Sequence, residues 1–288
     1  MGANYPPFES RSISANMLLF ALLAGIAGAR AAAGDDCKEA SEDCAVIGRW
    51  SFSVALGAGA RTNPLVHSEN IPLAVIPHVS YYGKRLFLDD LDFGVSLAET
   101  NSNALNLIAS PSYDRVFFYR SDLQNLFVTS LADGSYSVAD AGTPGAISFP
   151  PRSRRVTYLA GPEWTFKFLG VSGQFDFLHE ITGQNHGDEI RAALGIPLLE
   201  SRGSLSANFG ITWKSAAIVN YYYGAPGIYQ GVSALEPFFK LGYTLPLSGK
   251  WRFNAFAEIE HLGNSIARSP IVAEHDVATV FVGAIYSL

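Results

Sequence analysis

The chain ends on Asp276–Leu288, DVATVFVGAIYSL, and this stretch decides between the possible folds. Side chains alternate between the two faces of an extended strand, so every second residue here shares one apolar face. That face consists of Ala278, Val280, Val282, Ala284, Tyr286 and Leu288. Two interpretations fit the pattern: a membrane-facing strand that stops at the chain end, or an edge strand of a soluble sheet. The remainder of the sequence discriminates between them.

An apolar run near the start indicates export. Residues 17–29, MLLFALLAGIAGA, follow Arg11 and run into the small-x-small pattern Ala29-Arg30-Ala31. This length and order are typical of a secretory signal peptide and too short for a spanning helix. A buried core helix is the alternative, and Met17 is a second candidate start. We therefore predict a signal peptide over 1–31, a periplasmic segment over 32–49 and a barrel domain over 50–288.

The bulk composition restricts the class of protein further. Hydrophobic residues make up 48% of the 288 residues and mean hydropathy is +0.15, yet no later stretch approaches a spanning helix. An exported chain of this kind can cross a membrane only as a closed barrel, whereas a secreted soluble β protein is the competing class. The net charge of −6 argues against a nucleic-acid surface.

From Ala45 onward the sequence alternates between apolar and polar residues, with turn residues between the segments. The segments are about ten to twelve residues long, which suits tilted transmembrane strands better than the strands of soluble sheets. This length favours an all-β fold, a single transmembrane antiparallel barrel. The clearest segments lie at 50–58, 71–81, 171–180, 204–214, 251–260 and 276–288.

Connections of alternating length predict the topology. Tight turns at 83–84, 169–170 and 247–250 suit the periplasmic side, and longer stretches at 62–70, 182–187, 215–234 and 263–275 suit the exterior. The count is about twelve strands, with ten as the alternative. Twelve requires a further strand between Ile108 and Val156, for which Val116–Ser130 is the best candidate, followed by a hairpin tip at 132–135 and a large external loop to Arg155.

Aromatic clusters near strand ends predict girdles at the membrane interfaces. Core packing is the alternative for each cluster. They comprise Tyr81-Tyr82, Trp164 with Phe166 and Phe168, Tyr221–Tyr223, Phe238-Phe239 with Tyr243, and Trp251 with Phe253.

Charges on the second face of the segments predict the content of the barrel interior. Both signs occur and can pair across strands, so the lumen is either filled by ion pairs or left as a narrow pore. The predicted lumen charges are Arg61, Glu163, Lys167, Asp176, Glu180, Glu189, Arg191, Lys214, Lys240, Arg252, Glu258 and Glu260.

Motifs for catalysis or metal binding are weak. The sequence has no G-x-S-x-G elbow, His179-Glu180 lacks the second His of a zinc protease, and one His275-Asp276 neighbour pair is expected by chance. We therefore predict no catalytic residues, metal or cofactor. Cys37 and Cys44 favour a local disulfide over a metal pair.

Two polar segments suggest partners. The acidic stretch 35–43 is either a solvated linker or a periplasmic docking segment. Arg152, Arg154 and Arg155 could bind lipopolysaccharide phosphates through charge-assisted hydrogen bonds.

Several strings together resemble the MipA/OmpV family of outer-membrane β-barrel proteins, the MltA-interacting-protein group. They span nearly the whole mature chain, although each is short. Leu288 in place of the usual terminal Phe and the stretch 131–155 depart from the pattern. The strings are Trp50–Gly59 with Pro64, Ile71-Pro72 and Pro77; Tyr81–Phe87; Asn220–Gly224; Ser269–Val272; and Phe281–Tyr286.

This resemblance implies a function that the residues alone do not. It implies the outer membrane of a Gram-negative bacterium, with a final strand (Val280, Val282, Ala284, Tyr286, Leu288) read by the insertion machinery. It further implies a non-enzymatic scaffold that organises peptidoglycan-remodelling enzymes. A narrow pore for small solutes is the alternative function, and an outer-membrane hydrolase is the third.

Overall fold

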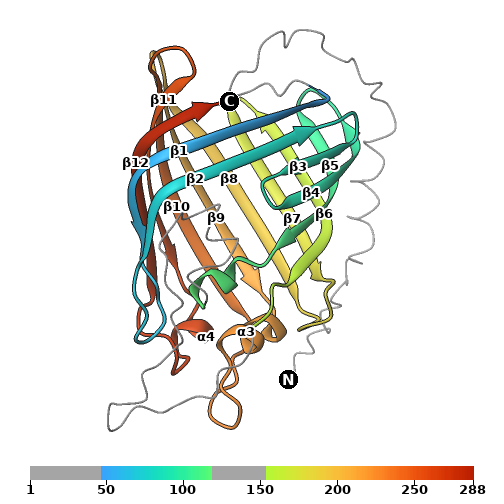
Figure 1. Ribbon diagram of the computed structural model, residues 1–288. Coiled ribbons are helices and arrows are strands. Elements are labelled where there is room, and N and C mark those ends of the chain that lie inside the picture. The colour runs from blue at the N-terminus through green and yellow to red at the C-terminus, as the bar shows by residue number, and fades with distance from the viewer. Residues whose placement is uncertain (1–46, 119–153) are drawn as a thin grey trace, which may run out of the picture. The chain divides into compact units, whose positions relative to one another are not determined.

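The computed structural model describes residues 47–118 and 154–288, and within them twelve antiparallel strands close into one barrel (Figure 1). Each strand pairs with its neighbours in the sequence, and β1 pairs with β12. The predicted all-β barrel of twelve strands is confirmed, and the ten-strand alternative is wrong. The strands are β1 (Arg49–Arg61), β2 (Ile71–Tyr82), β3 (Leu86–Asp89), β4 (Asp92–Glu99), β5 (Asn103–Pro111), β6 (Tyr158–Phe168), β7 (Val171–Glu180), β8 (Asp188–Glu200), β9 (Ser204–Lys214), β10 (Ala234–Pro246), β11 (Trp251–His261) and β12 (Asp276–Ser287).

Among the described residues, three short helices lie in the connections: η1 (Tyr113–Phe117), α3 (Ala216–Tyr223) and α4 (Asn264–Ala267). None of the described helices is long and apolar enough to cross a membrane. The predicted signal peptide, Cys37 and Cys44 lie outside the described residues.

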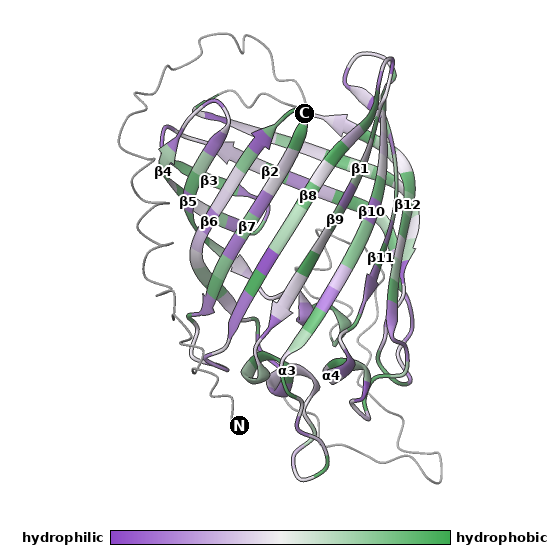
Figure 2. Cartoon of the chain, turned by 180° about the vertical axis from the view of Figure 1, so that it is seen from behind, coloured by the Kyte–Doolittle hydropathy of each residue, from purple (hydrophilic) through white to green (hydrophobic). Residues whose placement is uncertain are grey.

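The barrel wall has an apolar outer face and a polar inner face. Figure 2 shows hydrophobic and hydrophilic residues alternating along the strands. In β12, Val280 and Val282 are 51% and 55% exposed, whereas Phe281 between them is 1% exposed. The exposed face is the one that lipid would cover, because only apolar side chains are stable against hydrocarbon.

The two ends of the barrel differ in their connections. The turns between β2 and β3, β4 and β5, β6 and β7, β8 and β9, and β10 and β11 are short and meet at one end, which we call the short-turn end. The longer connections, including those that contain η1, α3 and α4, meet at the other, long-loop end (Figure 1). Short turns in such barrels face the periplasm, so the long-loop end faces outward.

The strand predicted between Ile108 and Val156 does not exist in the barrel. β5 pairs directly with β6, which leaves no place for it, and Val116 and Phe117 belong to η1. The even strand number comes instead from the short β3–β4 hairpin, which turns at Asp90-Leu91. The sequence analysis placed no boundary there, because an Asp-Leu turn lacks the usual Gly or Asn. Residues 119–130 of the candidate lie outside the described part of the chain.

The inner and outer faces of β2 exchange near its middle. Ile71 and Leu73 are buried inside the barrel, but beyond an irregular pairing with β1 between Leu56 and Gly59 it is Ile76 and His78 that face inward. The sequence pattern predicts one continuous alternation over 71–81. A β-bulge inserts one residue and exchanges the faces beyond it, which alternation alone does not reveal.

Aromatic rings gather on the outer face near the short-turn end. Trp50 contacts Tyr81, and Trp251 contacts Tyr286, with ring centroids 5.0 and 4.9 Å apart. Trp164 lies 5.0 Å from Phe166 in the same way. Such a belt fits the interface with lipid headgroups.

The closing seam between β1 and β12 depends on glycine. A Cβ on Gly57 would lie 2.3 Å from the Val282 carbonyl oxygen, whereas one on Gly242 in β10 would meet nothing nearer than 3.6 Å.

We expect Gly57→Ala to destabilise the barrel by about 1–3 kcal/mol through overpacking, and Gly242→Ala to be tolerated. Urea unfolding in detergent, followed by the shift in gel mobility of the unheated barrel, measures both. Equal stability of the two variants would contradict this account of the seam.

Candidate functional site: a capped lumen lined with charges

An apolar core closes the long-loop end of the barrel, and we call it the cap. It joins buried residues of α3 and α4 to inward-facing strand residues from around the wall. Residues so tightly packed leave no room for water between them. The cap residues are Leu65, Ile71, Ile108, Val116, Phe117, Leu159, Leu178, Ile218, Val219, Tyr222, Tyr223, Ala234, Leu262, Ile266, Val272 and Val277.

The tyrosine run of α3 belongs to the cap and not to a membrane girdle. Tyr222 and Tyr223 are fully buried. The Tyr222 hydroxyl lies 2.9 Å from the Thr157 hydroxyl, and burial raises the pKa of Tyr222 to about 12. The girdle prediction was therefore wrong for Tyr222 and Tyr223, because a short helix in a connection can bury its tyrosines against the barrel interior as readily as expose them to lipid.

Arg154 also holds the cap. Its guanidinium lies 4.1 Å above the Phe118 ring, and its Nε donates to the Tyr222 carbonyl oxygen at 2.6 Å. Arg154 is thus engaged within the protein, which weakens its predicted role in binding lipopolysaccharide. Arg155 is exposed, and Arg152 lies outside the described residues.

A buried ion-pair network lies directly beneath the cap. The Lys214 ammonium contacts Asp114 at 2.8 Å and Glu236 at 2.5 Å. The Tyr223 hydroxyl donates to the same Asp114 oxygen at 2.8 Å. Asp114 comes from η1, so the network ties the β5–β6 connection to β9, β10 and α3. Breaking such a buried pair from one side leaves an uncompensated charge, so the network locks the cap to the wall.

A second network covers the inner face of β5 to β8. Arg191 contacts Glu189 at 2.5 Å and donates to the Ser110 hydroxyl at 3.0 Å. Glu163 accepts hydrogen bonds from Asn106 and Gln174, and Gln174 also donates to the buried Asp176. These side chains therefore line the inner wall with hydrogen-bonded and ion-paired polar groups.

Five other predicted lumen charges lie on β1, β10 and β11. Arg61 contacts Glu260 at 3.4 Å and its guanidinium lies 5.1 Å from the Phe117 ring centroid. Lys240 contacts Glu258 at 3.5 Å. Arg252 pairs in register with Ile285 near the short-turn end.

Glu180 has a role that its sequence position did not suggest. Its carboxylate accepts the backbone N–H groups of Thr182, Gln184, Asn185 and His186. It therefore organises the β7–β8 loop and is not available to a solute in the lumen. A carboxylate at the end of a strand can bind the backbone of the following turn. The alternation of apolar and polar residues does not distinguish such a carboxylate from one that faces the lumen.

The lumen has a cavity towards the short-turn end. Its volume is about 420 Å³, and it is lined mostly by polar side chains from β4 to β9 and the β4–β5 turn. They include Asn103, Thr165, Lys167, Ser172, Gln174 and Asn208. Solvent therefore has room to enter the described part of the barrel from the short-turn end.

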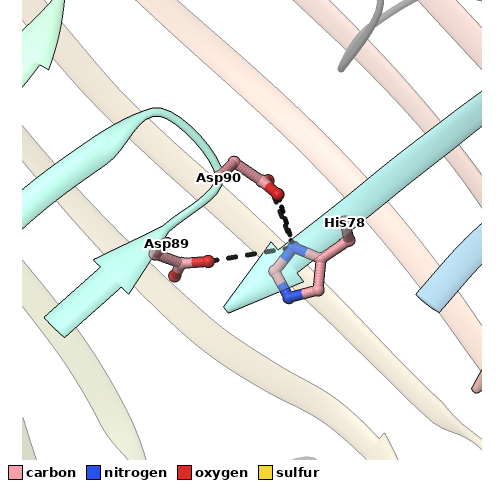
Figure 3. Close-up of side chains that lie close together, drawn as sticks. All are labelled: His78, Asp89 and Asp90. Carbon is pink, nitrogen blue, oxygen red and sulfur yellow. Dashed lines mark hydrogen bonds and ion pairs between the residues drawn. The ribbon is translucent and has the colours of Figure 1, made fainter. Parts of the chain in front are cut away.

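One cluster of possible metal ligands escaped the sequence analysis. The His78 imidazole and the carboxylates of Asp89 and Asp90 point towards one another on the inner wall (Figure 3). In the sequence, the signal is the acidic doublet Asp89-Asp90, which follows His78 by eleven and twelve residues. The irregular pairing of β1 with β2 hid this signal, because the faces of β2 exchange there and His78 comes to the inner face.

The pair considered for hydrolysis is arranged differently from the expectation. Asp276 contacts His261, not its neighbour His275, with Nδ1 and Oδ1 2.7 Å apart. Both side chains are more than half exposed, so the pair lacks the enclosed geometry of an acid–base site.

Several solved outer-membrane proteins resemble this chain in structure. The match with in-vitro folded OmpT of Vibrio cholerae spans 83% of this chain and 97% of the OmpT chain, with 9% identity and a TM-score of 0.34. An anion-selective porin from Comamonas acidovorans covers 83% and 98%, with 11% identity and a TM-score of 0.32. Ail of Yersinia pestis covers 84% and 100%, with 11% identity and a TM-score of 0.19. Scores this low carry no argument, so the fold rests on the strand pairing itself.

No protein of curated function matches this chain in sequence. The model of the family described as MltA-interacting protein MipA matches residues 54–288, which is almost the whole of the barrel. A Gram-negative outer-membrane location follows from that match together with the closed barrel. The chain belongs to the MipA family of outer-membrane β-barrel proteins.

Proposed function

We propose that this chain is a non-enzymatic outer-membrane interaction protein that holds peptidoglycan-remodelling enzymes at its short-turn end. The observation that carries the proposal is the cap. Packed apolar residues gather at the long-loop end, which supports a lumen without a continuous path across the membrane. The family description names MltA as a partner, and a periplasmic enzyme would meet the short-turn end.

The β6–β7 turn at that end presents an unusual side chain. Leu169 is 87% exposed and has a φ of +50°, followed by Gly170 at +81°. Asn or Asp with Gly is favoured in such a two-residue turn, because their backbones tolerate positive φ. A leucine that accepts this strain and stays exposed supports a contact surface at the tip of the hairpin.

A narrow pore is the second candidate function. It is supported by the polar cavity of about 420 Å³ at the short-turn end and by the charged inner wall. It requires the cap to move, and its conductance would change ion preference when Arg252 or Glu258 is neutralised.

Single-channel recording in a planar bilayer separates the two functions. We expect the refolded wild-type chain to give no conductance steps, because the cap blocks the lumen. The double variant Tyr222→Ala/Tyr223→Ala, which removes two buried rings from the cap, should give steps.

The matched control is Ile228→Ala, an exposed residue of the same loop that should leave the barrel silent. Regular steps from the wild-type chain would favour the pore over the interaction protein.

Direct binding tests the interaction role. Purified MltA should bind the immobilised, refolded chain, and Leu169→Asn should weaken binding at least tenfold while it relaxes the turn. Val232→Asn changes another exposed apolar residue, at the long-loop end, and should bind as the wild type does. Binding that neither substitution alters would remove the short-turn end as the docking surface.

A further inference from the structure

The wall of the barrel is weakest where β2 meets β3. These strands pair only at Ser80, Tyr81 and Tyr82 of β2, whereas β2 pairs with β1 along nearly its whole length. The β3–β4 hairpin ends at Asp90, so β2 continues past it towards the long-loop end. Any interaction between β2 and the hairpin tip therefore reinforces this seam.

His78 and the hairpin tip meet at the end of that seam. The His78 Nδ1 lies 3.1 Å from the Asp90 carboxylate and 3.8 Å from Asp89 Oδ1 (Figure 3). Possible ligand atoms of the three residues all lie within 4.8 Å of one another. The positive φ of Asp90, +53°, turns the chain so that two adjacent carboxylates reach the same imidazole, although neighbours in a strand point to opposite faces.

Each carboxylate is also oriented by a second donor. The Tyr82 hydroxyl donates to Asp89 Oδ2 at 2.9 Å, and the Val79 N–H donates to Asp90 Oδ1 at 2.9 Å. Outer contacts of this kind fix the direction of metal ligands in known sites. The side chains of His78, Asp89 and Asp90 are between 36% and 44% exposed, so an ion and its water ligands can reach them from the lumen.

We propose that His78, Asp89 and Asp90 bind one divalent transition-metal ion, with Zn²⁺ as the best fit, and that the ion clamps β2 to the β3–β4 hairpin. Tetrahedral Zn²⁺ with bonds of about 2.0–2.2 Å holds its ligand atoms about 3.3 Å apart, and the two nitrogen–oxygen distances bracket that value. One imidazole and two carboxylates suit Zn²⁺, with water in the fourth position. Ca²⁺ and Mg²⁺ prefer oxygen ligands alone.

The competing interpretation is an ion pair between protonated His78 and Asp90. In that pair a single positive charge on His78 faces two carboxylates, since Asp89 Oδ1 also lies 3.8 Å from Nδ1, whereas a dication balances both. The positive charge of Arg252 also acts on His78. Metal binding is thus opposed by one cation and favoured by two carboxylates.

Zinc titration of the refolded chain, read by competition with a fluorescent zinc indicator, tests the proposal. We expect His78→Gln and Asp90→Asn each to lose one bound Zn²⁺ per chain, or to bind it at least tenfold more weakly. Zn²⁺ should also raise the unfolding temperature of the wild type but not of these variants, because a ligand that binds only the folded state stabilises it.

The chain provides matched controls. His179 and His261 each contact a single aspartate, with Nδ1 and Oδ1 2.7 Å apart, so His179→Gln and His261→Gln should bind Zn²⁺ as the wild type does. The proposal fails if His78→Gln binds as many ions as tightly as the wild type, or if the wild type binds none below about 1 mM. If the variants do not fold, X-ray absorption of the zinc-loaded wild type decides. One nitrogen with oxygen ligands supports the site, and sulfur or several imidazoles overturn it.

Discussion

The need to pair every backbone N–H and C=O group within the membrane governs this structure. Hydrocarbon offers no substitute for water, so a sheet can cross it only when closed. Pairing of β1 with β12 provides that closure. The exception is the part of β2 that extends past the short β3–β4 hairpin. There the backbone groups that lack a neighbouring strand are satisfied by nearby residues. Pro77 has no N–H to satisfy, and the Asp90 side chain and backbone satisfy the N–H and C=O of Val79.

Closure creates an interior, and the cap determines what that interior can do. Lys214 sits among Asp114, Glu236 and Tyr223 beneath packed apolar residues, where removing a charge from water is costly unless it is paired. The partners come from different strands and from the β5–β6 connection, so the ion pairs hold only when the cap is seated. Such a network favours a cap that stays seated, and the short-turn end is the surface that a periplasmic partner would meet.

Local alternation predicted much of the fold, and long-range packing explains what it missed. The C-terminal strand and the other long alternating strands could be expected from period-two patterns and turn lengths, since these are local properties. The count of twelve was predicted correctly but through a strand at Val116–Ser130 that the barrel lacks, because the short β3–β4 hairpin left no turn signal. Val116 could not be assigned, because an apolar stretch fits a strand and a buried 3₁₀ turn equally well. The tyrosines of α3 and the carboxylate of Glu180 depend on partners far away in sequence or on the fold of a loop. The inward position of His78 depends on a bulge in the β1–β2 pairing.

The bulge and the short hairpin together have a consequence for the inner wall. Had β2 kept one alternation throughout, His78 would face lipid, where an imidazole is costly. Had β3 been as long as its neighbours, Asp89 and Asp90 would lie in mid-strand and point to opposite faces. Both irregularities are needed to bring three ligand groups to one point, and they occur at the seam with the fewest paired residues. The wall therefore carries its candidate metal ligands where a cross-link would stabilise it most, well away from the proposed docking turn at Leu169.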